Sequence, residues 1–178
     1  ISYRSFLVAR MEDKHQQLAD FRGRRVVCNS ADSQSGYNVL MKMITPLATY
    51  GAFFSRVLLS GGHYASLREL HKGTADIAAI DCVTWALIRR HHPMLLDGLV
   101  IIDQSPLAPG LPLITSRLTS PQTLALLRAA LAELVGNTAY QSICAALFIT
   151  GFSEVARETY DVLLDWRNAA MARGIMQL

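Results

Sequence analysis

Hydrophobic and polar positions follow two different periods along the first hundred residues. Short apolar runs typical of buried strands cover 5–9, 25–29, 56–59, 76–80 and 99–103. Between them, segments with the 3.6-residue period of amphipathic helices cover 35–44, 64–72 and 83–90. Strands that alternate with helices of about ten residues indicate βαβ units. We therefore expect an α/β fold with a mostly parallel sheet.

The pattern changes after residue 105. Residues 105–112 contain three prolines and one glycine, a composition that excludes a helix or a central strand and predicts a linker. A short strand is expected over 113–115, and helices are expected over 121–135, 138–147 and 153–172. Thr119 or Ser120 is positioned to cap the first of these helices, and Ser153 to cap the last.

Composition narrows the function classes. A chain of 178 residues with 51% hydrophobic residues can build one sizeable domain or parts of two. The net charge is only +3, which is too weak for a nucleic-acid footprint, so no nucleic-acid partner is expected. Three cysteines without a C-x-x-C pair, and five histidines without metal-ligand spacing, predict neither a disulfide framework nor a metal site. We expect no cofactor.

The polar stretch that follows residues 25–29 is a candidate anion site. A hydroxyl-rich turn leads there directly into a predicted helix, whose first amides lack intrahelical partners and lie at the positive end of the helix dipole. Ser33 and Ser35 add hydroxyl donors, and Gly36 permits a close approach to the backbone. The pattern predicts a phosphate-like or carboxylate ligand. A helix cap formed by Asp32, Ser33 or Ser35 is the alternative.

Two further strand ends carry polar side chains. Ser60-Gly61-Gly62-His63 follows the strand at 56–59, and Asp81 follows the strand at 76–80. Ligands of open parallel sheets bind outside the carboxyl ends of the strands, so we expect these groups to converge on one edge with the serines. For Asp81, a cap on the next helix is an equal alternative; for Tyr37, packing in the core competes with stacking on a ligand.

The same residues include the types found in a hydrolytic triad. Ser35, His63 and Asp81 supply a hydroxyl, an imidazole and a carboxylate, which makes an acyl-transfer enzyme the rival interpretation. No G-x-S-x-G elbow surrounds either serine, and an anion site needs these residue types without any chemistry. We therefore expect a binding protein with no catalytic residue.

The chain also resembles a known family over residues 3–135. The resemblance rests on the order and spacing of five segments: Asp20-Phe-Arg-Gly-Arg-Arg-Val26, Ser33-Gln-Ser-Gly-Tyr37, Ser60-Gly-Gly-His63, Gly73-Thr-Ala-Asp-Ile-Ala-Ala-Ile-Asp81 and residues 105–112. In these segments the chain resembles the phosphonate/phosphite/phosphate-binding (PhnD-like) substrate-binding proteins of ABC transporters, in the type 2 periplasmic-binding-protein superfamily.

The resemblance implies a set of site residues. In that family a Ser-Thr-Ser-Gly turn grips the ligand oxygens, a histidine assists, and an acidic residue reads the rest of the ligand. Gln34 stands where the family usually has threonine, which replaces a hydroxyl with an amide. The candidate ligand-binding residues are therefore Ser33, Gln34, Ser35, Gly36, Tyr37, His63 and Asp81.

The resemblance also implies a two-lobed clamp. Residues 1–10 would be a crossover strand, 11–105 a complete α/β ligand-binding lobe, and 106–118 the return crossover or hinge. Residues 119–178 would be C-terminal helices of a first lobe whose N-terminal part this chain lacks. The apolar stripes on those helices would then have no natural partner, so we expect possible self-association of this piece.

The implied function is that of a solute-binding component of an ABC importer. Its expected partners are a small oxyanion, phosphonate-like or phosphate-like, and an ABC permease. The expected location is periplasmic, or anchored to the membrane outside the cytoplasm. The alternative is a ligand-sensing domain of a signalling or regulatory protein that uses the same fold.

Overall fold

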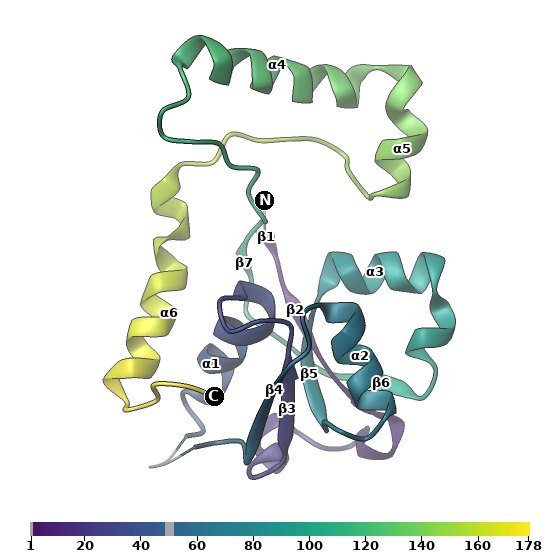
Figure 1. The fold of residues 1–178 in the computed structure, drawn as a ribbon, viewed down its shortest axis with the longest axis vertical. Coiled ribbons are helices and arrows are strands. Elements are labelled where there is room, and N and C mark those ends of the chain that lie inside the picture. The colour runs from purple at the N-terminus through teal and green to yellow at the C-terminus, as the bar shows by residue number, and fades with distance from the viewer. Residues whose placement is uncertain (1, 49–51) are drawn as a thin grey trace. The chain divides into compact units, whose positions relative to one another are not determined.

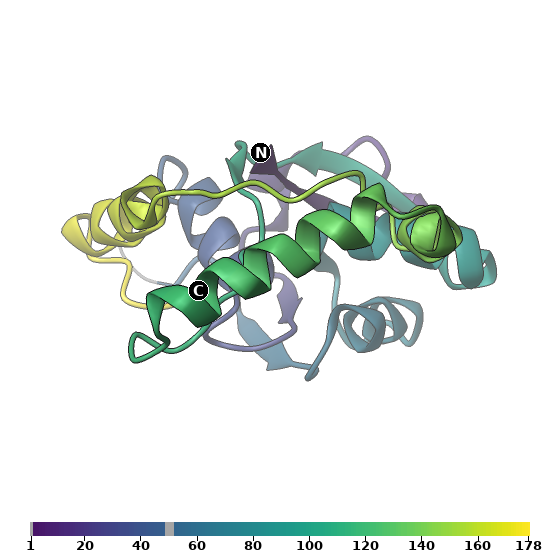
Figure 2. The same cartoon turned by 90° about the horizontal axis from the view of Figure 1, so that it is seen from above.

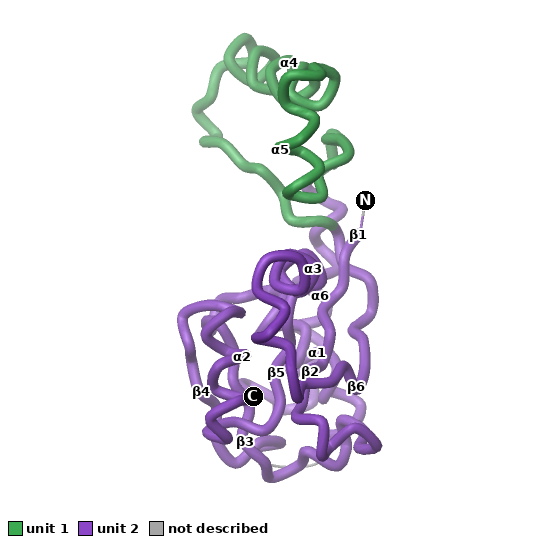
Figure 3. Tube along the Cα trace, turned by 90° about the vertical axis from the view of Figure 1, so that its right-hand side faces the viewer, with its two compact units in different colours: residues 1, 110–156 green, residues 2–109, 157–178 purple. Residues whose placement is uncertain are grey.

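The structure, a computed structural model, describes residues 2–48 and 52–178. The chain forms two compact units, shown in different colours in Figure 3. One unit combines Ser2–Pro109 with Arg157–Leu178 and contains the main sheet, and the other contains Gly110–Ala156. All of the candidate site residues therefore belong to the sheet unit. Within the described part of the chain, no helix is both long and apolar enough to cross a membrane.

The main sheet has the strand order β4-β3-β5-β2-β6. Strand β3 pairs in parallel with β4 and β5, whereas β2 pairs antiparallel with both β5 and β6. Four strands therefore run in one direction and β2 opposes them, which confirms the α/β fold with a mostly parallel sheet. The strand bounds are β2 Ser5–Arg10, β3 Arg25–Cys28, β4 Arg56–Leu59, β5 Ile77–Asp81 and β6 Leu99–Gln104.

Helices cover both faces of this sheet (Figure 1). Successive strand side chains point to opposite faces, so Val26 packs in one core and Val27 in the other. The first core is closed by α1 (Val39–Ile44) and α6 (Asp161–Ala172). The second is closed by α2 (His63–His71) and α3 (Cys82–His91). Burial on both faces explains why the strands read as continuous apolar runs.

Short elements complete the sheet unit. Strand β1 (Ser2–Tyr3) pairs antiparallel with β7 (Ala108–Pro109), so the proline-rich segment contributes a minimal two-stranded ladder. The remaining turns are 3-10 helices at Met11–Asp13, Leu18–Phe21, Pro93–Leu96 and Arg157–Tyr160, and a π-helical turn at Gln34–Asn38.

Helix α6 packs against α1, as the yellow and blue helices show in Figure 2. Asn38 Nδ2 donates to the carbonyl of Leu163 at 3.2 Å, and Arg173 Nη1 donates to the carbonyl of Thr45 at 3.2 Å. Trp166 and Ala170 are buried in the core beneath. The sequence interpretation placed residues 119–178 in one body, whereas the structure groups 157–178 with the sheet. The apolar stripe of this helix therefore has its partner within the chain.

The second unit contains α4 (Pro121–Gly136), a 3-10 turn (Thr138–Tyr140) and α5 (Gln141–Ala146). Ser120 caps α4 by accepting a hydrogen bond from the Thr123 amide at 3.1 Å, one of the two caps that the sequence proposed. Among the residues of this unit, Gly110–Ala156, Cys144 alone is buried, whereas Leu118 is 94% exposed. A unit with so little buried surface has little hydrophobic stabilisation of its own.

Two sequence predictions in the C-terminal half are wrong. The expected strand at 113–115 is an exposed segment outside any sheet, because no strand among the described residues supplies partners for its backbone. The last helix does not begin at Ser153; it begins at the 3-10 turn Arg157–Tyr160. Residues 151–156 are exposed, and a helical turn without an apolar surface to pack on is marginal in water.

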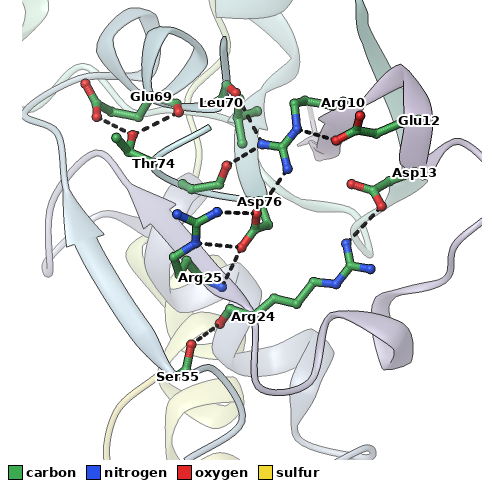
Figure 4. Close-up of polar contacts among 11 residues, drawn as sticks. Arg10, Glu12, Asp13, Arg24, Arg25, Ser55, Glu69, Leu70, Thr74 and Asp76 are labelled. Carbon is green, nitrogen blue, oxygen red and sulfur yellow. Dashed lines mark hydrogen bonds and ion pairs between the residues drawn. The ribbon is translucent and has the colours of Figure 1, made fainter. Parts of the chain in front are cut away.

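An ion-pair cluster joins three strands at the edge of the sheet opposite the candidate site (Figure 4). The buried Asp76 carboxylate accepts from Arg25 Nη2 at 2.7 Å, from the Arg25 amide at 2.9 Å and from Arg10 Nη2 at 3.0 Å. Burial by itself raises the pKa of Asp76, but the hydrogen bonds from Arg25 and Arg10 outweigh burial and hold it well below its usual range. Asp76 is therefore ionised throughout the physiological range and ties β2 and β3 to the start of β5.

We predict that Asp76→Asn lowers the free energy of unfolding by about 3 kcal/mol at neutral pH, because it leaves two arginines facing a neutral amide. A carboxylate whose pKa is lowered by folding stabilises the folded state fully at pH values above its unfolded-state pKa of about 4. This stabilisation is lost as the pH falls through the folded-state pKa. Urea unfolding should thus show a gap between the two proteins that closes only in strong acid. Glu12→Gln, which alters an exposed partner of Arg10, is the control; an equal loss in both variants contradicts the prediction.

Candidate anion site

The helix that follows β3 begins with a wide turn. Ser33 Oγ accepts from the Gly36 amide at 2.9 Å, and the Ser33 carbonyl accepts from the amides of Tyr37 and Asn38 at 3.1 and 2.9 Å. The capping alternative is thus realised, and Ser33 is the cap. The bond from Asn38 spans five residues, which gives the π-helical geometry that recurs at functional sites. The turn leaves the amides of Gln34 and Ser35 at the start of the helix, where amides lack intrahelical partners.

Ser35 and His63 come together at the end of the sheet. Ser35 Oγ lies 2.8 Å from His63 Nε2, and the Ser35 carbonyl accepts from Ser5 Oγ at 2.8 Å. Burial lowers the pKa of His63, and the charge of Asp81 and the backbone of Ala79 oppose that shift without overcoming it. The imidazole is therefore neutral at physiological pH, and the serine is fixed from two sides.

The loop that carries His63 is docked on the end of β3. The Ser60 amide donates to the carbonyl of Cys28 at 2.9 Å, and the Gly61 amide donates to the carbonyl of Asn29 at 2.8 Å. Gly61 has a φ of +87°, a left-handed conformation that favours glycine. Ser60 Oγ donates to the Gly62 carbonyl at 2.9 Å. These bonds fold the loop back so that α2 begins beside Ser35.

Among the described residues, only one of the two carboxylate oxygens of Asp81 has a hydrogen-bond partner. It is the last residue of β5 and 3% exposed, and its Oδ1 accepts from the Thr84 amide at 2.7 Å, which caps α3. Its Oδ2 is buried and has no hydrogen-bond partner among the described residues. A buried carboxylate oxygen without a donor is costly, so the site has an unused acceptor.

Tyr3 is a polar residue of this region that the sequence analysis missed. Burial raises the pKa of its phenol to about 12, and Asp81 and Cys82 add to the shift. Its hydroxyl is buried and has no partner within the described chain. The strand register places Ser5 opposite Asp81, so Tyr3, two residues before Ser5, lies near the end of β5. Only that antiparallel register, which the sequence pattern does not reveal, connects Tyr3 to the site.

The remaining two candidates are held by local contacts. Tyr37 Oη accepts from the amide of Leu178 at 3.2 Å and its ring packs on the first core, as the core alternative proposed. Gln34 Oε1 accepts from Asn38 Nδ2 at 2.5 Å, while its Nε2 is buried and without a partner in the described residues. The Gln34 side-chain amide therefore has a fixed orientation, and its Nε2 is a spare donor group.

The chemistry of this site is that of hydrogen bonding. The described residues contain no cluster of three or more side chains suited to hold a metal ion. Burial raises the pKa of the nearby Cys28 thiol to about 12, so this thiol stays protonated and unreactive. What the site offers is hydroxyls, an imidazole, helix-start amides and one carboxylate.

Comparison with known proteins identifies the family. The sequence pattern of the family described as ABC transporter, phosphonate, periplasmic substrate-binding protein matches residues 1–160. The chain belongs to this family. Membership in the phosphonate-binding family supports a solute-binding role, and the resemblance stated from the sequence motifs is confirmed. No curated protein sequence matches the chain.

Solved structures share the fold of this phosphonate-binding family member. A binding protein component of an ABC phosphonate transporter from Pseudomonas aeruginosa superposes with a TM-score of 0.78 at 21% identity, over 97% of this chain and 58% of that one. PhnD1 from Prochlorococcus marinus, in complex with methylphosphonate, gives a TM-score of 0.77 at 13% identity, over 97% and 68%. A Xanthomonas citri protein bound to ATP gives a TM-score of 0.67 at 16% identity, over 97% of this chain and 67% of that one. The fold is thus that of type 2 periplasmic binding proteins, and the chain spans roughly three-fifths to two-thirds of their length.

The turn of the candidate site leaves no room for a side chain at Gly36. A Cβ at Gly36 would lie 2.0 Å from Asn29 Oδ1, whereas a Cβ at Gly62 would meet no atom within 4 Å. We expect Gly36→Ala to lower the free energy of unfolding by about 1–3 kcal/mol through overpacking, and Gly62→Ala to be tolerated. Asn29→Ala in the Gly36→Ala background removes the clashing amide and should restore part of the loss. Chemical denaturation of the four proteins measures this, and equal stability of Gly36→Ala and Gly62→Ala would contradict the geometry.

Proposed function

We propose that this chain is the solute-binding component of an ABC importer and holds a phosphonate or related oxyanion at the helix start after β3. The carrying observation is the 2.8 Å contact between Ser35 Oγ and His63 Nε2 beside the opening amides of that helix. Family membership supports the solute-binding role. The proposed ligand-binding residues are Ser33, Gln34, Ser35, Gly36, Tyr37, His63 and Asp81.

The pair of Ser35 and His63 suits an anion because the hydrogen bond between Ser35 Oγ and His63 Nε2 can run in either direction. A neutral imidazole either accepts from the serine through Nε2 or donates to it. An oxyanion only accepts hydrogen bonds, so its arrival favours the tautomer with the proton on Nε2. Ser35 can then accept from His63 and turn its own O–H to the ligand. Hydrogen bonds to a charged acceptor are shorter and stronger than neutral ones.

Asp81 gives this site its expected selectivity. Its buried Oδ2 is an acceptor without a donor in the described residues, so an ammonium or hydroxyl group on the ligand would satisfy it. A bare anion would instead approach a carboxylate of the same sign. The ligands that fit best carry an oxyanion at one end and a hydrogen-bond donor at the other.

We propose binding without catalysis for these residues. In a hydrolytic triad the carboxylate orients the imidazole. Here Asp81 Oδ1 caps α3, and neither Asp81 Oδ2 nor His63 Nδ1 has a hydrogen-bond partner among the described residues, so the carboxylate does not hold the imidazole. The proposal also includes an ABC permease as the partner and a location outside the cytoplasm, periplasmic or membrane-anchored. The family description, a periplasmic substrate-binding protein of an ABC transporter, supports the transporter and the periplasmic location.

The first prediction for this function concerns Ser35. Ser35→Ala should weaken the binding of methylphosphonate, phosphite or phosphate by about 1.5–3 kcal/mol, because one hydrogen bond to a charged group is lost. Titration calorimetry measures the change. Ser55→Ala removes a hydroxyl at the opposite edge of the sheet and should leave the affinity unchanged. Equal affinity in wild type and a Ser33→Ala/Ser35→Ala variant would overturn the site.

The second prediction concerns Asp81 and a matched ligand pair. Aminoethylphosphonate should bind more tightly than ethylphosphonate, which lacks only the amine, and Asp81→Asn should narrow that ratio. Asparagine keeps an oxygen for the Thr84 amide, so the cap on α3 is preserved. If Asp81→Asn weakens both ligands equally, the carboxylate is structural and the proposed selectivity fails.

We also propose self-association of this piece through residues 110–156. Leu118 is 94% exposed and Leu126 71%, and covering such side chains gains about 25 cal/mol per Å². Light scattering should give a mass above the 19.6 kDa of one chain, and a Leu118→Glu/Leu126→Glu variant should lower it. Met176→Glu changes an exposed residue of the sheet unit and is the control. A monomeric wild type contradicts the proposal.

A further inference from the structure

Helix α2, the C-terminal end of α3 and the turn Pro93–Leu96 lie together at one corner of the sheet unit (Figure 1). His71 Nε2, at the end of α2, lies 2.7 Å from the carbonyl of Leu95 in the turn that follows α3. The rings of Tyr64 and His92 meet edge to face, with centroids 5.9 Å apart. Tyr64 is in the first turn of α2 and His71 is its last residue, so the whole of α2, the end of α3 and the turn Pro93–Leu96 form one continuous surface.

This surface carries an excess of positive charge. Its exposed basic residues, which we term the basic corner, are Arg68, His71, Lys72, Arg89, Arg90, His91 and His92. Two acidic residues accompany them: Glu69, which pairs with Lys72 at 2.7 Å, and the exposed Asp97. The four arginines and lysines thus exceed the acids by two, out of a net charge of +3 for the whole chain. The negative C-terminal ends of α2 and α3 offset about half of one positive charge each.

An apolar side chain projects beside these cations. Met94 is 81% exposed, and it borders a hollow of about 360 Å³ together with Arg68, His71, Lys72 and Leu95. Cations beside a projecting apolar side chain are the combination that binds the boundary of an anionic membrane, where phosphates meet acyl chains.

We propose that the basic corner contacts membranes that carry anionic phospholipids. The arginines bind headgroup phosphates, and Met94 enters the headgroup layer. The contact is weak, reversible and sensitive to salt, because it rests on a few exposed charges. Its two test residues, Arg68 and Arg89, lie five residues beyond His63 and eight residues beyond Asp81, about 8 and 12 Å along α2 and α3.

Co-sedimentation of the full chain with vesicles tests this proposal. Vesicles of phosphatidylcholine with phosphatidylglycerol should retain the protein at low salt and release it at high salt, and vesicles of phosphatidylcholine alone should not retain it. Arg68→Gln with Arg89→Gln should weaken retention roughly 30-fold, because each cation near an anionic surface contributes about a factor of five. Arg157→Gln with Arg167→Gln removes two exposed arginines elsewhere on the same unit and should retain wild-type binding.

The outcomes separate the possible partners. Equal retention on both vesicle types, or an equal loss in the control variant, overturns the proposal. So does a protein that ignores phosphatidylglycerol but binds polyglutamate beads through Arg68 and Arg89, because the corner would then recognise an acidic protein surface. Met94→Ser should weaken vesicle binding and leave any binding to polyglutamate unchanged. None of these variants touches the proposed phosphonate site, so its failure and the failure of this proposal are distinguishable.

Discussion

The pairing of β2 between β5 and β6 is the constraint on which the sheet and the candidate site both depend. This strand opposes its neighbours, and its central residues Leu7, Val8 and Ala9 are completely buried. Its register sets Ser5 opposite Asp81, and the Ser5 hydroxyl holds the carbonyl of Ser35 at 2.8 Å. One strand therefore fixes the relative positions of the carboxylate and the anion turn, although they lie far apart in the sequence.

Local pattern was enough to predict the elements of the sheet unit. The runs at 25–29 and 76–80 are buried on both faces, so their apolar composition identifies them without further context, whereas the run at 56–59 is a more exposed edge strand. The convergence of Ser35 and His63 followed from the rule that parallel strands present their carboxyl ends at one edge. The family resemblance added the type 2 periplasmic-binding-protein fold, which the solved structures share.

What the pattern did not predict depends on distant contacts. The π-helical turn at Gln34–Asn38 and the spare oxygen of Asp81 follow from how neighbouring loops pack, and Tyr3 joins the site only through the antiparallel register of β2. The failures at 113–115 and at Ser153 have a related cause. Both segments have suitable residues, but no neighbouring strand or apolar surface completes them. Periodicity reports which face a segment can bury and says nothing about whether a partner exists.

Capping and ligand binding are compatible roles at this sheet edge. Ser33 uses a lone pair to accept from the Gly36 amide, so its O–H remains available to donate. Asp81 likewise commits one oxygen to the Thr84 amide and keeps the other. Each cap immobilises its side chain before any ligand arrives, which removes part of the entropic cost of binding. In the proposed function, the cap that competed with the anion site as an interpretation of the sequence prepares that site.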